Sequence, residues 1–158
     1  MFKRILTLTA LSLAAFPAQA DETGFYGKWE ITGAVKAPWE DPDRPMINDG
    51  AELYSGKIVE ISKGHMNGPD LLGCGETMLT VEALPYAGLF EGGLAANPKN
   101  AADPYDLDKA RRLAGELGFE AEPVESLFHG CSEIILHRMN AGTLLFGLNN
   151  RIFKLEKR

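Results

Sequence analysis

The chain has 158 residues, of which 45% are hydrophobic, a share typical of a globular domain. It carries 16 Lys and Arg against 22 Asp and Glu, for a formal net charge of −6. With no run of basic residues before the last few positions, the sequence disfavours nucleic acid and anionic membrane surfaces as partners, because both require clustered positive charge. A cationic partner would suit this charge, although mild acidity also simply promotes solubility.

The first twenty residues have the pattern of a signal peptide. A basic start, MFKR, precedes an apolar run of about twelve residues and the small-x-small ending of PAQA. We expect cleavage between Ala20 and Asp21, which leaves residues 21–158 as a single exported domain in the periplasm or outside the cell. Loss of Lys3 and Arg4 takes the formal charge from −6 to −8. Because the apolar run is shorter than the roughly 20 residues of a spanning helix, we expect no stable membrane insertion.

The first half of the mature chain predicts strands. Residues 26–35, YGKWEITGAV, alternate apolar and polar side chains, which is typical of a strand with one wet face. The proline-rich acidic segment 37–50 predicts a surface loop. Residues 55–69 predict a hairpin, and residues 73–84 a further strand, in which Gly73 and Gly75 indicate a bulge or irregular start.

The second half contains the one expected helix. In residues 106–118, Asp106 is a candidate N-cap, apolar residues recur at helical spacing, and Gly118 can end the helix. The segment 88–94, GLFEGGL, predicts a short strand or a loop that folds back, and EAEPVES predicts a solvated acidic loop. Three short strands in a meander, within 131–139, 141–148 and 149–157, end the chain. The sequence therefore predicts a mainly β fold: a small antiparallel β-barrel or strongly curled sheet with one inserted α-helix.

The segment 128–139, FHGCSEIILHRM, places Cys131 between two histidines. An even cysteine count in an oxidising compartment favours a disulfide between Cys74 and Cys131, the one possible pairing. A catalytic thiol with His137 is disfavoured, because six residues along a strand span roughly 20 Å. His129 and Cys131 could share a metal, but two ligands are too few without His65 or a carboxylate. We therefore favour a structural disulfide and expect no metal.

The motif Gly27-x-Trp29 on the first predicted strand resembles the opening motif of lipocalins. That resemblance implies a barrel whose tryptophan closes one end as a structural plug, with Arg151 of the last strand stacked on Trp29 by a cation–π contact. The layout of the chain, with its leader, its early GKW strand and its final TLLFGLNNRIFKL, also resembles small periplasmic proteins of proteobacteria. This second resemblance implies a compartment and a fold and supplies no activity.

Neither GHMNG nor FHGCS has the spacing of a known hydrolase, zinc or nucleotide motif, so we expect no enzyme and no cofactor. Two non-enzymatic roles remain. The first is a lipocalin-like binding protein for a small apolar or amphipathic ligand in a barrel mouth, with Trp39, Tyr86 and Phe90 as candidate contacts. The second is an envelope protein-binding factor, such as an inhibitor of a cationic, lysozyme-like hydrolase, which electrostatic steering would favour.

Overall fold

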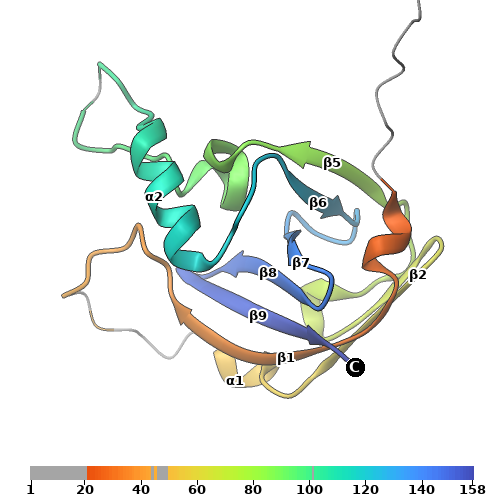
Figure 1. The fold of residues 1–158 in the computed structure, drawn as a ribbon. Helices are drawn as coiled ribbons and strands as arrows, with labels where there is room; N and C mark the ends of the chain where they lie inside the picture. Colours follow the sequence, from red (N-terminus) through yellow and green to blue (C-terminus); the bar gives the residue numbers. More distant parts are fainter. Residues whose placement is uncertain (1–20, 44, 46–49, 101) are drawn as a thin grey trace, which may run out of the picture.

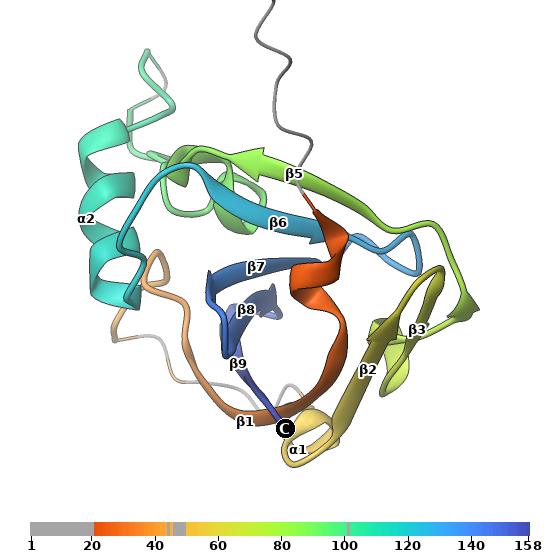
Figure 2. The ribbon, with the colours of Figure 1, turned by 45° about the vertical axis from the view of Figure 1, so that its right-hand side comes forward.

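A curled antiparallel sheet organises the protein. The structure, a computed structural model, describes residues 21–43, 45, 50–100 and 102–158. Within these residues nine strands form one sheet in the order β4-β3-β2-β1-β9-β8-β7-β6-β5, which curls into a half-barrel (Figures 1 and 2). The expectation of a mainly β, strongly curled sheet is confirmed. The predicted signal peptide, residues 1–20, lies outside the described residues.

The described part of the chain forms nine strands, two α-helices and three 3₁₀ helices. The strands are β1 (Gly27–Lys36), β2 (Ile58–Ser62), β3 (His65–Asn67), β4 (Gly75–Glu76), β5 (Thr80–Leu84), β6 (Val124–Phe128), β7 (Ile135–Asn140), β8 (Thr143–Leu148) and β9 (Arg151–Lys157). The α-helices are α1 (Ala51–Tyr54) and α2 (Leu107–Leu117), and the 3₁₀ helices are η1 (Glu22–Phe25), η2 (Asp70–Leu72) and η3 (Tyr86–Gly92). None of the helices in the described ranges is long and apolar enough to cross a membrane.

The chain starts in the middle of the sheet with β1 and reaches one edge at β4. It then crosses to the opposite edge at β5 and returns to the middle at β9. β1 pairs with β2 on one side and with the last strand, β9, on the other. The segment predicted as one strand, 73–84, is divided: β4 lies at one edge of the sheet and β5 at the opposite edge. This expectation was wrong because residues 77–79 cross the open side of the curl between the two edges.

Covalent and polar contacts hold the open side of the half-barrel together. Cys74, just before β4, forms a disulfide with Cys131 in the β6–β7 loop, with 2.07 Å between the sulfur atoms. Thr77 Oγ1 donates to the carbonyl of His129, and Ser132 Oγ donates to the carbonyl of Leu71 at 2.9 Å. Gly75 has a φ of +78°, so an irregular backbone conformation follows Cys74 as expected. The β4 edge and η2 are therefore joined to the β6–β7 loop without strand pairing.

The inside of the curl is filled by side chains. Trp29 is fully buried there, and its Nε1 donates to the carbonyl of Phe25 in η1 at 2.8 Å. Phe146 and Phe153 stack with ring centroids 4.8 Å apart. The other fully buried residues of this core include Ile31, Val59, Met66, Leu72, Leu127, Leu136, Leu144 and Leu155. The half-barrel is therefore a packed scaffold in its interior.

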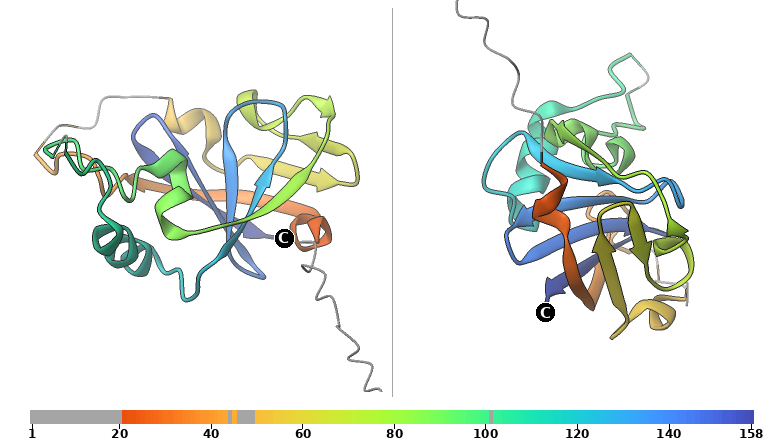
Figure 3. Two further views of the ribbon diagram at one scale, coloured as in Figure 1. Left: turned by 90° about the horizontal axis from the view of Figure 1, so that it is seen from above. Right: turned by 90° about the vertical axis from the view of Figure 1, so that its right-hand side faces the viewer.

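A second apolar layer covers part of the outer face. The expected helix is present as α2, with the Asp106 side chain accepting from the N–H of Lys109 at 2.8 Å and Gly118 in the left-handed conformation after its last turn. α2 and η3 lie together at the end of the molecule away from η1 (Figures 1 and 3). Their buried side chains pack on outward-facing residues of the sheet, among them Val124, Leu145 and Ile152. Part of the outer face of β6, β8 and β9 is thus buried as well, whereas Lys154 and Glu156 farther along β9 are exposed.

Two further segments differ from the sequence prediction. The segment 88–94 is mostly part of η3, and EAEPVES runs into β6. β6 was missed because its inward-facing Glu125 hides the apolar alternation of the strand. That carboxylate forms an ion pair with Arg138, whose guanidinium carbon lies 5.7 Å from the centroid of the Phe25 ring.

Candidate functional site

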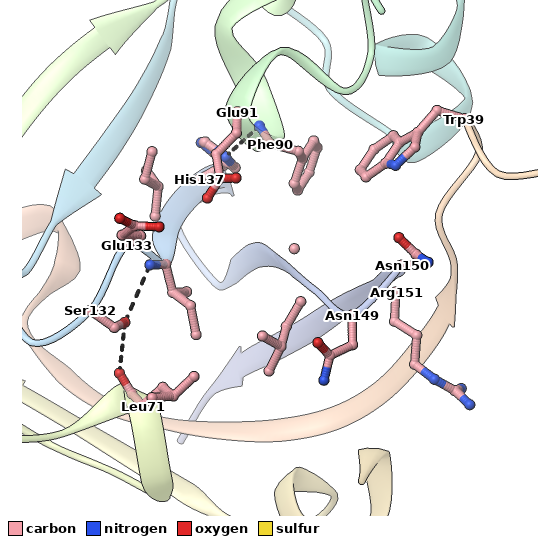
Figure 4. Close-up of a pocket in the computed structure, with 14 residues that line it drawn as sticks. Trp39, Leu71, Phe90, Glu91, Ser132, Glu133, His137, Asn149, Asn150 and Arg151 are labelled. Carbon is pink, nitrogen blue, oxygen red and sulfur yellow. Dashed lines mark hydrogen bonds between the residues drawn. The ribbon is translucent and has the colours of Figure 1, made fainter. Parts of the chain in front are cut away.

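The candidate site is a pocket beside the layer formed by α2 and η3, where Trp39 and Phe90 of that layer approach Ile134 and Leu148 of the inner core. It has a volume of about 400 Å³, within the range of small-molecule sites. Elements from across the chain form it (Figure 4): the loop after β1, η2, η3, the β6–β7 loop, β7, β8 and the β8–β9 turn. Its lining residues are Trp39, Leu71, Phe90, Glu91, Ser132, Glu133, Ile134, Ile135, His137, Gly147, Leu148, Asn149, Asn150 and Arg151.

Two aromatic rings form one wall of the pocket. Trp39 and Phe90 have ring centroids 5.6 Å apart with planes tilted by 38°. Each ring lies against a glycine. A Cβ atom on Gly93 would come within 3.0 Å of the Trp39 ring, and one on Gly147 within 3.3 Å of Phe90 Cδ1. The absence of side chains at these two positions is therefore what lets the rings approach the backbone.

His137 lies behind this wall, fully buried on β7. Its Nε2 accepts a hydrogen bond from the N–H of Phe90 at 3.0 Å, and its Nδ1 lies 2.8 Å from Ser126 Oγ. Because Nε2 is an acceptor, the proton of the neutral ring is on Nδ1, which donates to Ser126 Oγ. Ser126 Oγ in turn donates to the carbonyl of Val124 at 3.3 Å. Both ring nitrogens are thus used in holding the wall of the pocket.

Burial lowers the pKa of His137 to about 3, since the interior disfavours its charged form. The ring is therefore neutral near pH 7 and can accept the Phe90 N–H. With Nε2 already bonded, its lone pair is not available to a bound molecule in this arrangement. The geometry assigns His137 the role of a support for η3.

The segment supported by His137 has an uncommon backbone conformation. Phe90 and Glu91 have φ values of 50° and 57°, the left-handed region, which costs a residue other than glycine roughly 1–2 kcal/mol. The Phe90 ring also packs edge-on against His137, with centroids 4.6 Å apart. This hydrogen bond and this ring contact hold the turn that places Phe90 and Glu91 at the pocket.

The β8–β9 turn forms the opposite rim. Asn149 and Asn150 have φ values of 49° and 62°, as a tight hairpin turn of two residues requires. The sequence LNN indicated such a turn, and β8 pairs directly with β9 across it. The turn places Arg151 at the pocket, on the side where Trp39 lies in Figure 4.

The predicted contact between Arg151 and Trp29 does not form. The register of β1 with β9 pairs Trp29 with Lys157 and Lys36 with Arg151. Arg151 therefore lies six residues along β9 from Lys157, the partner of Trp29, which is roughly 20 Å at about 3.3 Å per residue. The cation over the Trp29 ring is Lys157, whose Nζ lies 5.1 Å from the ring centroid. The prediction was wrong because an alternating pattern shows which face a residue occupies but not the register of two distant strands.

Of the three aromatic residues predicted as ligand contacts, the structure brings Trp39 and Phe90 together at the pocket. Tyr86 lies elsewhere, packed against Phe119 with ring centroids 6.4 Å apart. Its backbone N–H donates to Glu122 Oε1 at 2.7 Å. Tyr86 therefore anchors the start of η3 and does not line the pocket. The sequence prediction missed the supporting residues His137, Ser126, Gly93 and Gly147. For His137 alone the sequence held a signal, namely its position within an apolar predicted strand.

Cys131 and the histidines around it serve the fold. Cys131 is paired with Cys74, and its N–H donates to His129 Nδ1 at 3.3 Å. Burial lowers the pKa of His129, so its ring is also neutral near pH 7. Within the described part of the chain, no three His, Cys, Asp or Glu side chains gather as they would around a metal ion.

Comparisons of the chain with family models, with curated proteins and with solved structures found no match.

Proposed function

We propose that this protein is an exported, non-enzymatic binding protein that holds a small amphipathic molecule in the pocket beside Trp39 and Phe90. One observation carries the proposal: a pocket of about 400 Å³ that combines an aromatic wall with a polar rim. Such a combination gives a ligand apolar area to bury and polar groups to fix its orientation.

The pocket does not lie inside the curl, where a barrel-shaped binding protein is expected to hold its ligand. Because the inside of the curl is filled by packed side chains, the ligand would lie beside that core, between η3 and the β8–β9 turn. The sheet then acts as the rigid scaffold, and His137 keeps η3 in place. Export to an oxidising compartment is part of the proposal, and the Cys74–Cys131 disulfide is compatible with it.

A neutral aromatic probe, N-phenyl-1-naphthylamine, tests the proposal. Its fluorescence should rise on binding and saturate at one probe per chain. Trp39→Ala should weaken binding about tenfold, because it removes one wall of the pocket and a ring contact with Phe90. Tyr105→Ala is the matched control, since Tyr105 is 61% exposed and does not line the pocket.

Two results would refute this function. One is the absence of saturable binding by the folded protein, and the other is equal binding by Trp39→Ala and the unchanged chain. A third experiment tests the alternative role, using a column of immobilised hen lysozyme, a cationic hydrolase. If the probe failed to bind and this column retained the protein at low salt, the role of a protein-binding inhibitor would replace the proposed ligand-binding function.

A further inference from the structure

The polar rim of the pocket is asymmetric in charge. Glu91 and Glu133 both line it and are both exposed. Neither carboxylate has a hydrogen bond or an ion pair with any residue that the structure describes. In Figure 4 the two glutamates lie on the His137 side of the pocket, whereas Trp39 and Arg151 lie on the other side. One end of the pocket is therefore acidic, with no counter-charge supplied by the described residues.

Three of the described lining residues are charged. The two carboxylates and the Arg151 guanidinium together give −1, because His137 is neutral near pH 7. Arg151 already takes part in another interaction of the protein. A ligand with a single positive charge would neutralise the pocket. A fatty acid would instead bring a third carboxylate to it.

We infer that the pocket selects an amphipathic monocation, a protonated or quaternary amine that carries an apolar chain or ring. The inference rests on the proposed function and specifies its ligand class. The apolar part would lie against Phe90, Leu148 and the Trp39 ring, and the ammonium group would lie between Glu91 and Glu133. Aromatic faces also attract ammonium groups, so Trp39 would not oppose a cation near it. The excess negative charge of the whole chain adds long-range attraction for such a ligand.

Three probes with the same ten-carbon chain test the class: decyltrimethylammonium, decyl maltoside and decanoate. Each is titrated into the protein by calorimetry below its micelle concentration and at low salt. We expect the cationic probe to bind about tenfold more tightly than the neutral one, and decanoate to bind more weakly than both. The preference for the cation should shrink as NaCl is added, because the rim charges are exposed to solvent.

Two double variants test whether Glu91 and Glu133 cause the preference for the cationic probe. Glu91→Gln with Glu133→Gln should reduce affinity for decyltrimethylammonium about tenfold and affinity for decyl maltoside by a clearly smaller factor. Glutamine keeps the size of each side chain, so the pocket keeps its shape. The matched control, Glu82→Gln with Glu120→Gln, removes the same charge from two exposed residues outside the pocket and should change neither affinity by more than about twofold.

The outcomes separate this inference from the function on which it rests. If decanoate or decyl maltoside bound as tightly as the cation, the ligand class would be wrong while the binding function stood. An equal loss in both double variants would also overturn the inference, because total charge and not the rim would explain the preference. If none of the three probes bound and N-phenyl-1-naphthylamine also failed, the binding function itself would be wrong.

Discussion

Replacement of His137 by glutamine should change how the stability of the protein depends on pH. The folded protein keeps this histidine neutral until about pH 3, whereas in the unfolded chain it gains a proton near pH 6.5. Below pH 6.5 the unfolded chain therefore binds one more proton than the folded protein at this site. The free energy of unfolding falls by about 1.4 kcal/mol for each pH unit in that range, down to the folded pKa.

The magnitude at an accessible pH follows directly. Between pH 7.5 and pH 4.5 the unchanged protein should lose about 2–3 kcal/mol that the His137→Gln variant does not lose. At pH 7.5 the variant should itself be less stable by about 1–3 kcal/mol, since the buried Phe90 N–H and Ser126 Oγ lose well-placed partners. The two stability curves should therefore converge as the pH falls.

Urea denaturation followed by circular dichroism at pH 7.5, 6.5, 5.5 and 4.5 gives both curves. The contributions of His129 and of the carboxylates are present in both proteins, so they cancel in the difference. His65→Gln is the matched control for replacing a histidine by glutamine, because the His65 side chain is 48% exposed. Parallel curves for His137→Gln and the unchanged protein would refute the assignment of His137 as a buried neutral support.

Two further changes address the cross-link and the pocket wall. Replacing Cys74 and Cys131 by alanine opens a loop with a sequence separation of 57. By the chain-entropy estimate this should lower the free energy of unfolding by about 4 kcal/mol, and an unchanged denaturation midpoint would contradict it. Gly93→Ala places a methyl group 3.0 Å from the Trp39 ring. It should displace that ring and weaken probe binding about threefold to tenfold, whereas Gly33→Ala, with open space around it, should not.

Local patterns in the sequence predicted the elements whose stability is local. The helix α2 depends on an N-cap at Asp106, on helical spacing of apolar residues and on Gly118, all within one short segment. The β8–β9 turn depends on Asn149 and Asn150, which tolerate positive φ. The two cysteines allowed one pairing, which the structure contains. The helix and the turn could be predicted because they depend on neighbouring residues. The disulfide could be predicted because two cysteines allow only one pairing.

The missed elements depend on partners that are distant in the chain. β6 carries Glu125 on its inward face, and the ion pair with Arg138 of β7 is what makes that carboxylate acceptable there. η3 contains two consecutive left-handed residues, Phe90 and Glu91, and the Phe90 N–H donates a hydrogen bond to His137, which is 47 residues away. No pattern within either segment reports such a partner.

The sequence by itself determined the curled β class of the fold, its helix and its cross-link, because periodicity, capping and cysteine count are properties of short segments or of composition. Only the tertiary structure decided where a ligand could lie. Strand register moved Arg151 away from Trp29 and to the rim of the pocket, and packing filled the interior of the curl. Folding also brought Trp39, Phe90 and His137 together from three separate segments. Register and packing are set by contacts between distant residues, so they arise only when the whole chain folds.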